Sequence, residues 1–177
     1  MKKVLIHASL IITFIFIYLL QSIVFTNFTI ASVMPNMFII LVLFIGLYMG
    51  RCMGTIYGII FGVLIDLWIG QRIGLTSIGL ALVGIIGGAF DKNFSKDSRI
   101  IIIFIGVLST IFYEVLLYVC NIIFMKINVE IFAFIKVLLL EIIYNVLIII
   151  ILYPLMKNIG NQIESEIKGD KILTRYF

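Results

Sequence analysis

The sequence predicts an all-α protein, a polytopic bundle of six transmembrane helices. Hydrophobic residues make up 63% of its 177 residues, and charged residues make up 12%. The mean hydropathy of +1.27 lies far above the range of soluble domains. Polar residues divide the chain into apolar stretches, most of which are close to the length needed to cross a bilayer. Glycines recur at every fourth residue through the middle of the chain. Such spans leave no room for a soluble catalytic domain.

The spans are expected near residues 4–25, 36–50, 53–70, 74–90, 99–125 and 131–156. The first is longer than the core of a signal peptide and lacks a cleavage site, so we expect a retained helix. The second and third are short and share a tight turn at Arg51–Cys52, which predicts an antiparallel hairpin. Tyr153–Pro154 is expected to end the last helix. One transmembrane domain, 1–156, is then followed by a short cytoplasmic tail, 157–177.

The distribution of basic residues predicts the orientation of the chain. With the N-terminus in the cytoplasm, only Arg72, Lys126 and Lys136 face outward. The remaining cations then face the cytoplasm: Lys2, Lys3, Arg51, Lys92, Lys96, Arg99, Lys157, Lys168, Lys171 and Arg175. The positive-inside rule prefers this arrangement, which places both termini in the cytoplasm. The net charge of +4 follows from these flanks and suits anionic lipid head groups, not nucleic acid.

A ladder of glycines climbs through the second and third spans: Gly46, Gly50, Gly54, Gly58 and Gly62. No hydrophobic force draws helices together inside lipid, and small residues at this spacing let helix backbones approach closely instead. The ladder is therefore a helix-packing surface. Its use within this chain is the favoured interpretation. The alternative is that Gly54, Gly58 and Gly62, or the adjacent edge at Asp66, receive the helix of a partner.

Several polar residues fall inside the predicted spans: Asp66, Glu114, Asn121, Glu141 and Asn145. An unpaired charge in lipid is costly, so such residues are candidates for function. Glu141 and Asn145 are four residues apart and share a helix face that must point away from lipid. We expect Asp66, Glu114 and Glu141 to converge on an outward-facing cavity near the three outward cations. They either pair with bases, tyrosines and asparagines inside the bundle, or form a ligand pocket or a seam for another protein's helix.

Enzymatic chemistry is not expected. No span places a nucleophile and a base at useful spacing, and no glycine-rich phosphate loop with its lysine is present. Cys52 and Cys120 lack the spacing of metal ligands, and His7 is the only histidine. We therefore expect no catalytic residue, no bound cofactor and no metal site.

A set of motifs runs through the chain in a fixed order: Pro35–Asn36, Gly50–Arg51, Gly54, Gly58, Gly62, Asp66–Leu67, Gly74–Leu75, Asn145 and Tyr153–Pro154. This order, together with the length and the span count, resembles the MreD family, a multi-span component of the bacterial rod-shape system. The resemblance covers nearly the whole chain. It implies a non-enzymatic scaffold of the bacterial inner membrane that acts in the regulation of cell shape and in wall elongation.

The same resemblance implies a set of partners. The direct partner would be MreC, a single-span protein with an external domain. Through it the scaffold would link the cytoplasmic, actin-like MreB to peptidoglycan synthases, namely the glycosyltransferase RodA and a class B penicillin-binding transpeptidase. Membrane lipids would surround the bundle, and no nucleic acid is implied.

The span count and the glycine-rich middle also resemble the substrate-binding S components of energy-coupling-factor transporters. Under this alternative Asp66, Glu114, Glu141 and Asn145 would line an outward-facing pocket for a vitamin or a cation. Those S components commonly carry small residues four apart in the first helix, where they dock an energising partner. Here Ala8 is followed at that spacing by Ile12, so the first helix departs from their pattern.

Overall fold

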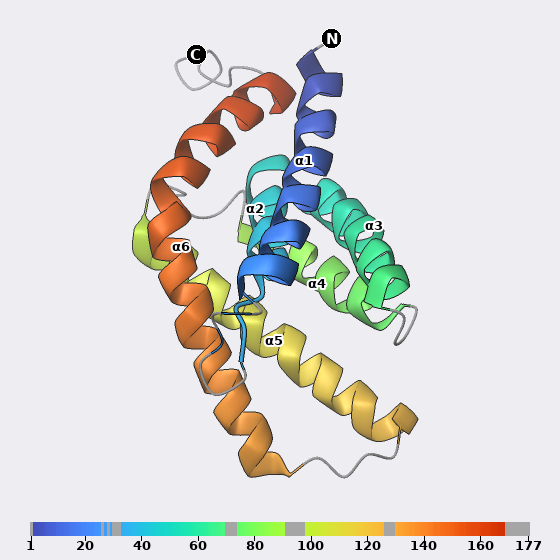
Figure 1. Cartoon of the computed structure of the whole chain (residues 1–177). Coiled ribbons are helices and arrows are strands. Elements are labelled where there is room, and N and C mark those ends of the chain that lie inside the picture. Colours follow the sequence, from blue (N-terminus) through green and yellow to red (C-terminus); the bar gives the residue numbers. More distant parts are fainter. Residues whose placement is uncertain are drawn as a thin grey trace.

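The computed structural model of the chain is helical in every regular element that it describes (Figure 1). The described residues are 2–25, 27, 29, 33–69, 74–90, 98–125 and 130–168. The elements are α1 (Lys2–Leu19), the π-helical η1 (Leu20–Phe25), α2 (Met37–Met49), α3 (Arg51–Ile69), α4 (Leu75–Phe90), α5 (Arg99–Met125) and α6 (Ile131–Lys168). The prediction of an all-α fold is therefore confirmed.

Within the described part of the chain, four helical segments are long and apolar enough to cross a membrane: Val4–Ile23, Arg51–Trp68, Arg99–Phe124 and Ile131–Ile167. The other two helices, α2 and α4, are apolar but shorter, with 13 and 16 residues. At the rise of an α-helix, α2 is about 20 Å long and does not reach across a hydrocarbon core of about 30 Å. The protein is therefore a membrane protein in which long apolar helices pack with two short ones.

The short helix α2 forms the centre of the bundle. All of its 13 residues are buried, and it contacts α1, α3, α4, α5 and α6. Its sequence, Met37–Met49, has no polar stripe, and a helix that is apolar on all sides is stable only when other elements cover it completely. The core of the protein is thus built around α2.

A single residue, Gly50, joins α2 to α3. Its φ of +92° lies in the left-handed region that glycine adopts without strain. Its N–H donates to the carbonyl oxygen of Gly46 at 3.0 Å and closes the end of α2. The tight turn expected beside Arg51 is therefore present, and α3 begins at Arg51 itself.

The last helix differs from its predicted end. We expected Tyr153–Pro154 to end it, but α6 continues through Pro154 to Lys168. Two buried residues in the continued part, Gly160 and Ile163, pack against the bundle, so tertiary contacts maintain the helix beyond the proline. In Figure 1 this end of α6 lies beside the N-terminal end of α1, whereas the end of α5 and the start of α6 lie at the opposite end of the molecule.

Aromatic rings attach α1 to the bundle. Phe14 stacks on Phe61 of α3 with ring centroids 4.3 Å apart, and Tyr18 contacts Trp68 with centroids 4.2 Å apart. Nearer the N-terminus, Nδ1 of His7 forms a 2.5 Å hydrogen bond with the hydroxyl of Tyr57. These contacts fix one side of α1 on α3.

Candidate functional site

The backbone of α4 lies directly against the backbones of α2 and α3, with no side chains between the helices. A Cβ atom built on Gly46 would lie 2.4 Å from the carbonyl oxygen of Gly84, and one on Gly54 would lie 2.7 Å from the same oxygen. Further along α3, a Cβ on Gly58 would lie 2.5 Å from the carbonyl oxygen of Leu80. Real side chains do not approach backbone so closely, so only glycine fits these positions.

The contact continues to both ends of α4. A Cβ on Gly62 would lie 2.3 Å from Cα of Ser77, and one on Gly88 would lie 2.4 Å from Cα of Arg51. We call these residues the glycine interface: Gly46, Gly54, Gly58 and Gly62 on α2 and α3, and Gly84 and Gly88 on α4. Four of the ladder glycines thus pack within the chain, and the fifth, Gly50, forms the turn.

The glycine interface corrects one expectation. We considered Gly54, Gly58 and Gly62 as a face for a partner's helix, but α4 covers that face in the structure. The sequence reasoning also overlooked Gly84 and Gly88. Their four-residue spacing in the fourth span was the signal that could have identified α4 as the helix packed on the ladder.

Asp66 has a different role from the other acids in the spans. Its Oδ2 accepts hydrogen bonds from the backbone N–H of Gly74 at 2.8 Å and of Ser77 at 3.4 Å, and from Ser77 Oγ at 3.3 Å. These groups lie at the start of α4, where the first N–H groups of a helix have no partner within the helix. Asp66 is only 4% exposed. It therefore ties the end of α3 to the start of α4 instead of joining a cavity with Glu114 and Glu141.

A second set of polar residues meets where α2 begins. The backbone N–H of Asn36 donates to Oδ1 of Asn145 at 2.9 Å, and Nδ2 of Asn145 donates to Oγ1 of Thr110 at 3.0 Å. The side chain of Asn36 accepts a hydrogen bond from the N–H of Ile39 at 3.4 Å and caps α2. Asn145 thereby connects α2, α5 and α6, and it is 1% exposed.

Two carboxyl groups extend this set. Glu114 of α5 and Glu141 of α6 share a side-chain hydrogen bond, and Glu141 also contacts the amides of Asn36 and Asn145. Tyr113, beside Glu114, contacts the side chains of Thr76 and Asn36 through its hydroxyl. We call this set the polar cluster: Asn36, Thr110, Tyr113, Glu114, Glu141 and Asn145.

The position of the polar cluster within the bundle explains why hydrogen-bonding side chains are needed there. Asn145 lies about 21 Å along α6 from Ile131, at the rise of an α-helix. The N-terminus of α2, which Asn145 contacts, is therefore deep within the apolar length of the bundle. Irregular backbone at such depth needs hydrogen-bond partners from the protein because lipid supplies none. The polar cluster supplies them, and one oxygen of Glu141, Oε1, has no partner among the described residues.

The predicted convergence of the acids is thus met in part. Glu114, Glu141 and Asn145 meet, as expected for a polar seam in the bundle, whereas Asp66 has its own partners on α4. The side chain of Lys136 is exposed on α6, and Arg72 and Lys126 lie outside the described residues. Asn36 and Thr110 were not among our candidate site residues. Their polar character in otherwise apolar surroundings was the available signal.

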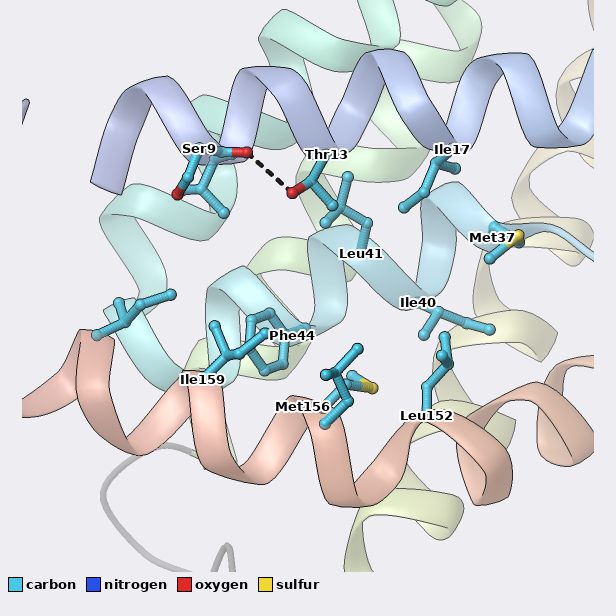
Figure 2. Close-up of a pocket in the computed structure, with 13 residues that line it drawn as sticks. Ser9, Thr13, Ile17, Met37, Ile40, Leu41, Phe44, Leu152, Met156 and Ile159 are labelled. Atoms are coloured by element: carbon cyan, nitrogen blue, oxygen red, sulfur yellow. Dashed lines mark hydrogen bonds between the residues drawn. The ribbon is translucent and has the colours of Figure 1, made fainter. Parts of the chain in front are cut away.

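A separate, apolar groove lies between α1 and α6, with α2 as its floor (Figure 2). Its narrow part has a volume of about 140 Å³. Figure 2 shows Ser9 and Thr13 of α1 opposite Met156 and Ile159 of α6. The Oγ1 of Thr13 donates to the carbonyl oxygen of Ser9 at 2.8 Å, so this hydroxyl is satisfied within α1 and the groove wall remains apolar.

Among the described residues, no group of three or more histidines, cysteines, aspartates or glutamates could hold a metal ion. The arrangement of the polar cluster is suited to holding helices together, since its members bond to one another and to backbone. Two members of the cluster also bond to helix backbone. The side chain of Asn36 accepts a hydrogen bond from a backbone N–H of α2, and the hydroxyl of Thr110 donates one to a backbone carbonyl oxygen of α5.

A family model described as rod shape-determining protein MreD matches residues 1–162 of this chain. The match includes the glycine interface, the polar cluster and most of the groove. No curated protein and no solved structure matches the chain significantly.

Proposed function

Because this chain belongs to the MreD family of rod shape-determining membrane proteins, we propose that it is a non-enzymatic scaffold of the cell-wall elongation complex in the bacterial inner membrane. The family match is the observation that carries the proposal. The architecture supports it, because the described residues form one bundle of apolar helices whose polar groups are used to connect helices. Such a bundle offers lateral surfaces to other membrane proteins.

The proposed topology has six spans and both termini in the cytoplasm. The N-terminal end of α1 and the C-terminal end of α6 lie at the same end of the bundle, which supports an even number of crossings (Figure 1). The short apolar helices α2 and α4 count as spans in this proposal, because each lies between two longer apolar helices in the chain. Arg51 and Arg99 begin α3 and α5 at the end that would face the cytoplasm, in agreement with the positive-inside rule.

The proposed direct partner is MreC, with MreB, RodA and a class B penicillin-binding transpeptidase in the same complex. Their assignment rests on the family and not on a contact in this structure. A single transmembrane helix such as that of MreC needs a lateral surface of the bundle. The glycine interface is internal, so the surface has to lie elsewhere on the protein.

The experiment is co-purification of the tagged protein with co-expressed MreC in mild detergent, with polypeptides and small molecules read by mass spectrometry. A scaffold retains MreC in a fixed ratio and carries no stoichiometric small molecule. A stoichiometric vitamin without MreC would favour the transporter alternative and overturn the scaffold. An unrelated single-span protein of similar hydropathy serves as the control for nonspecific retention.

The geometry favours the scaffold over the S component of a transporter. A binding pocket of the S component kind would have Glu114, Glu141 and Asn145 on its wall. In the structure these side chains bond to one another and to α2, and they line neither of the two described cavities.

A further inference from the structure

The apolar groove between α1 and α6 opens into a wider mouth at the end of the bundle where α1 begins. The mouth has a volume of about 440 Å³ and shares Ser9, Ile159 and Ile163 with the narrow part of the groove. Both helices line it: Leu5, Ile6 and Ser9 of α1, and Ile159, Gln162, Ile163, Ser165 and Glu166 of α6. Packing of the helices leaves apolar surface uncovered here, since Leu5 is 72% exposed and Ile159 is 42% exposed.

The mouth lies beside the polar end of α6. The apolar segment Ile131–Ile167 has 37 residues and is about 55 Å long at the rise of an α-helix, so it extends beyond a hydrocarbon core of about 30 Å. Polar residues mark the end that leaves the core: Asn158, Asn161, Gln162, Glu164, Ser165 and Glu166. The hydrocarbon of a bilayer excludes such residues, so lipid chains cover the mouth poorly.

The sequence continues beyond Lys168, the last residue of α6, with residues 169–177, which we call the end segment. These nine residues lie outside the described part of the chain. Two apolar pairs, Ile172–Leu173 and Tyr176–Phe177, alternate in it with the basic residues Lys171 and Arg175. Side chains of the first kind gain free energy when an apolar surface covers them. The exposed apolar surface nearest in the sequence is the mouth.

The end segment begins close to the mouth and is long enough to cover it. Gly169 follows α6 directly, and glycine after a helix commonly reverses the chain because it adopts a positive φ without strain. Ser165, only three residues before Lys168, already lines the mouth. Ile159 lies about 14 Å back along α6 from Lys168, whereas the eight residues after Gly169 span about 26 Å when extended. A single reversal therefore brings the end segment across the whole mouth.

We propose that the end segment folds back over the mouth and covers it, with its two apolar pairs against the walls formed by α1 and α6. The segment is then an intramolecular cap that closes this end of the groove to other occupants. Lys171 and Arg175 remain at the surface, where they suit anionic lipid head groups. This inference concerns the chain itself and does not depend on the proposed function or its partners.

The shape and chemistry of the groove fit this occupant. The narrow part has a volume of about 140 Å³, and a cavity of about 150 Å³ holds one benzene ring. It therefore has room for one aromatic ring, and its apolar walls suit Phe177. The hydroxyls of Ser9 and Ser165 donate to the carbonyl oxygens of Ile6 and Gln162 at 2.8 and 2.9 Å, so neither hydroxyl needs an acceptor in the end segment.

The first test is disulfide formation between the end segment and α1, in a protein freed of its native cysteines by Cys52→Ser and Cys120→Ser. Ser9→Cys places a thiol at the mouth, and Thr174→Cys places one in the end segment without removing an apolar side chain. Ala8→Cys is the matched control. It lies one position away on α1 and is also exposed, but it does not line the mouth.

A disulfide forms where the two Cα atoms come within about 7 Å of each other. Under mild oxidation we expect a link within one chain from position 174 to position 9, and far less from 174 to 8. Non-reducing electrophoresis and peptide mass spectrometry measure both. Equal links to the two positions, no link to position 9, or links only between two copies of the chain overturn the proposal.

The second test measures access to the mouth as the rate at which a maleimide labels Ser9→Cys in detergent. Leu173→Ser with Phe177→Ser removes two apolar side chains of the cap and is expected to raise this rate roughly three- to tenfold, because the segment loses apolar area to bury. Lys171→Ser with Arg175→Ser is the matched control. It changes two residues of the same segment, keeps both apolar pairs and leaves the rate unchanged.

Labelling of Ala8→Cys shows whether the cap variants disturb α1 itself. We expect the same rate at position 8 in all of these proteins. A rate at position 9 that responds to neither double variant would mean that lipid or detergent covers the mouth, and it overturns the proposal. A rise at positions 8 and 9 together, or an equal rise from both double variants, contradicts a specific cap.

Discussion

Oδ1 of Asn145, deep in α6, accepts the backbone N–H of Asn36 at 2.9 Å, although the two residues are 109 positions apart in the chain. Through this bond the last helix holds the start of the central helix α2. The same side chain donates to Thr110 of α5 at 3.0 Å. One amide group, 1% exposed, thus connects three helices, so it should contribute strongly to the stability of the bundle.

Replacement of Asn145 tests this connection. Asn145→Leu keeps the approximate volume but leaves the N–H of Asn36 without a partner, and an unsatisfied buried donor costs about 1–3 kcal/mol. We expect a clear fall in the thermal unfolding midpoint in detergent. Asn121→Leu is the matched control, because Oδ1 of Asn121 has no partner among the described residues. Equal effects of the two variants would show that the bond to Asn36 is unimportant.

The glycine interface is expected to tolerate no side chain on α4. A Cβ at Gly84 would lie 2.2 Å from the carbonyl oxygen of Gly54, so Gly84→Ala forces α3 and α4 apart and costs about 1–3 kcal/mol or more. At Gly106 the nearest atom is Cδ1 of Ile149, the flexible end of a side chain. Gly106→Ala is therefore the milder control. Comparing membrane levels and unfolding midpoints of the two variants checks the difference, and a Gly84→Ala protein as stable as wild type would contradict it.

Asp66 is expected to stabilise the protein by accepting hydrogen bonds and not through its negative charge. Asp66→Ala removes the partner of the Gly74 N–H and should destabilise the α3–α4 connection by about 1–2 kcal/mol, as loss of a helix cap does. Asp66→Asn retains an acceptor oxygen and should retain most of the stability. The measurement is thermal unfolding of both variants in the same detergent. A loss as large for asparagine as for alanine would indicate that the negative charge matters.

The carboxyl pair of Glu114 and Glu141 is expected to show strong coupling. Glu141→Leu leaves the Glu114 carboxyl in the bundle without its partner, whereas the double change to leucine removes both polar groups. The double variant should be more stable than the sum of the single changes implies, by about 0.5–3 kcal/mol. A double-mutant cycle of unfolding free energies measures this. Simple additivity would mean that the two carboxyl groups do not interact.

The sequence was a good guide to the helices and to the need for close packing. Composition and polar residues between the apolar stretches located five of the six described helices, and the start of α6, to within a few residues, because apolar length is a strong signal in a membrane protein. The ladder predicted backbone contact. The ladder did not identify α4 as the helix in contact. A stripe of small residues shows that another helix can pack closely there, but not which helix does so.

Other features depended on contacts between distant residues. Pro154 suggested the end of a helix, yet the buried positions Gly160 and Ile163 maintain α6 beyond it. Asp66 was expected to converge on a cavity with Glu114 and Glu141, but Gly74 and Ser77 at the start of α4 donate hydrogen bonds to it instead. The apolar groove has no sequence signal of its own, since its walls come from α1, α2 and α6 and form only on packing.

The central claim is that this protein maintains rod shape, and the most direct test is its depletion in the bacterium that encodes it. The measurement is the ratio of cell length to cell width as the protein is lost, with and without re-expression from a second locus. We expect cells to widen and become round on depletion, and the wild-type gene to restore rods. Cells that keep their shape and width after complete loss of the protein would contradict the claim.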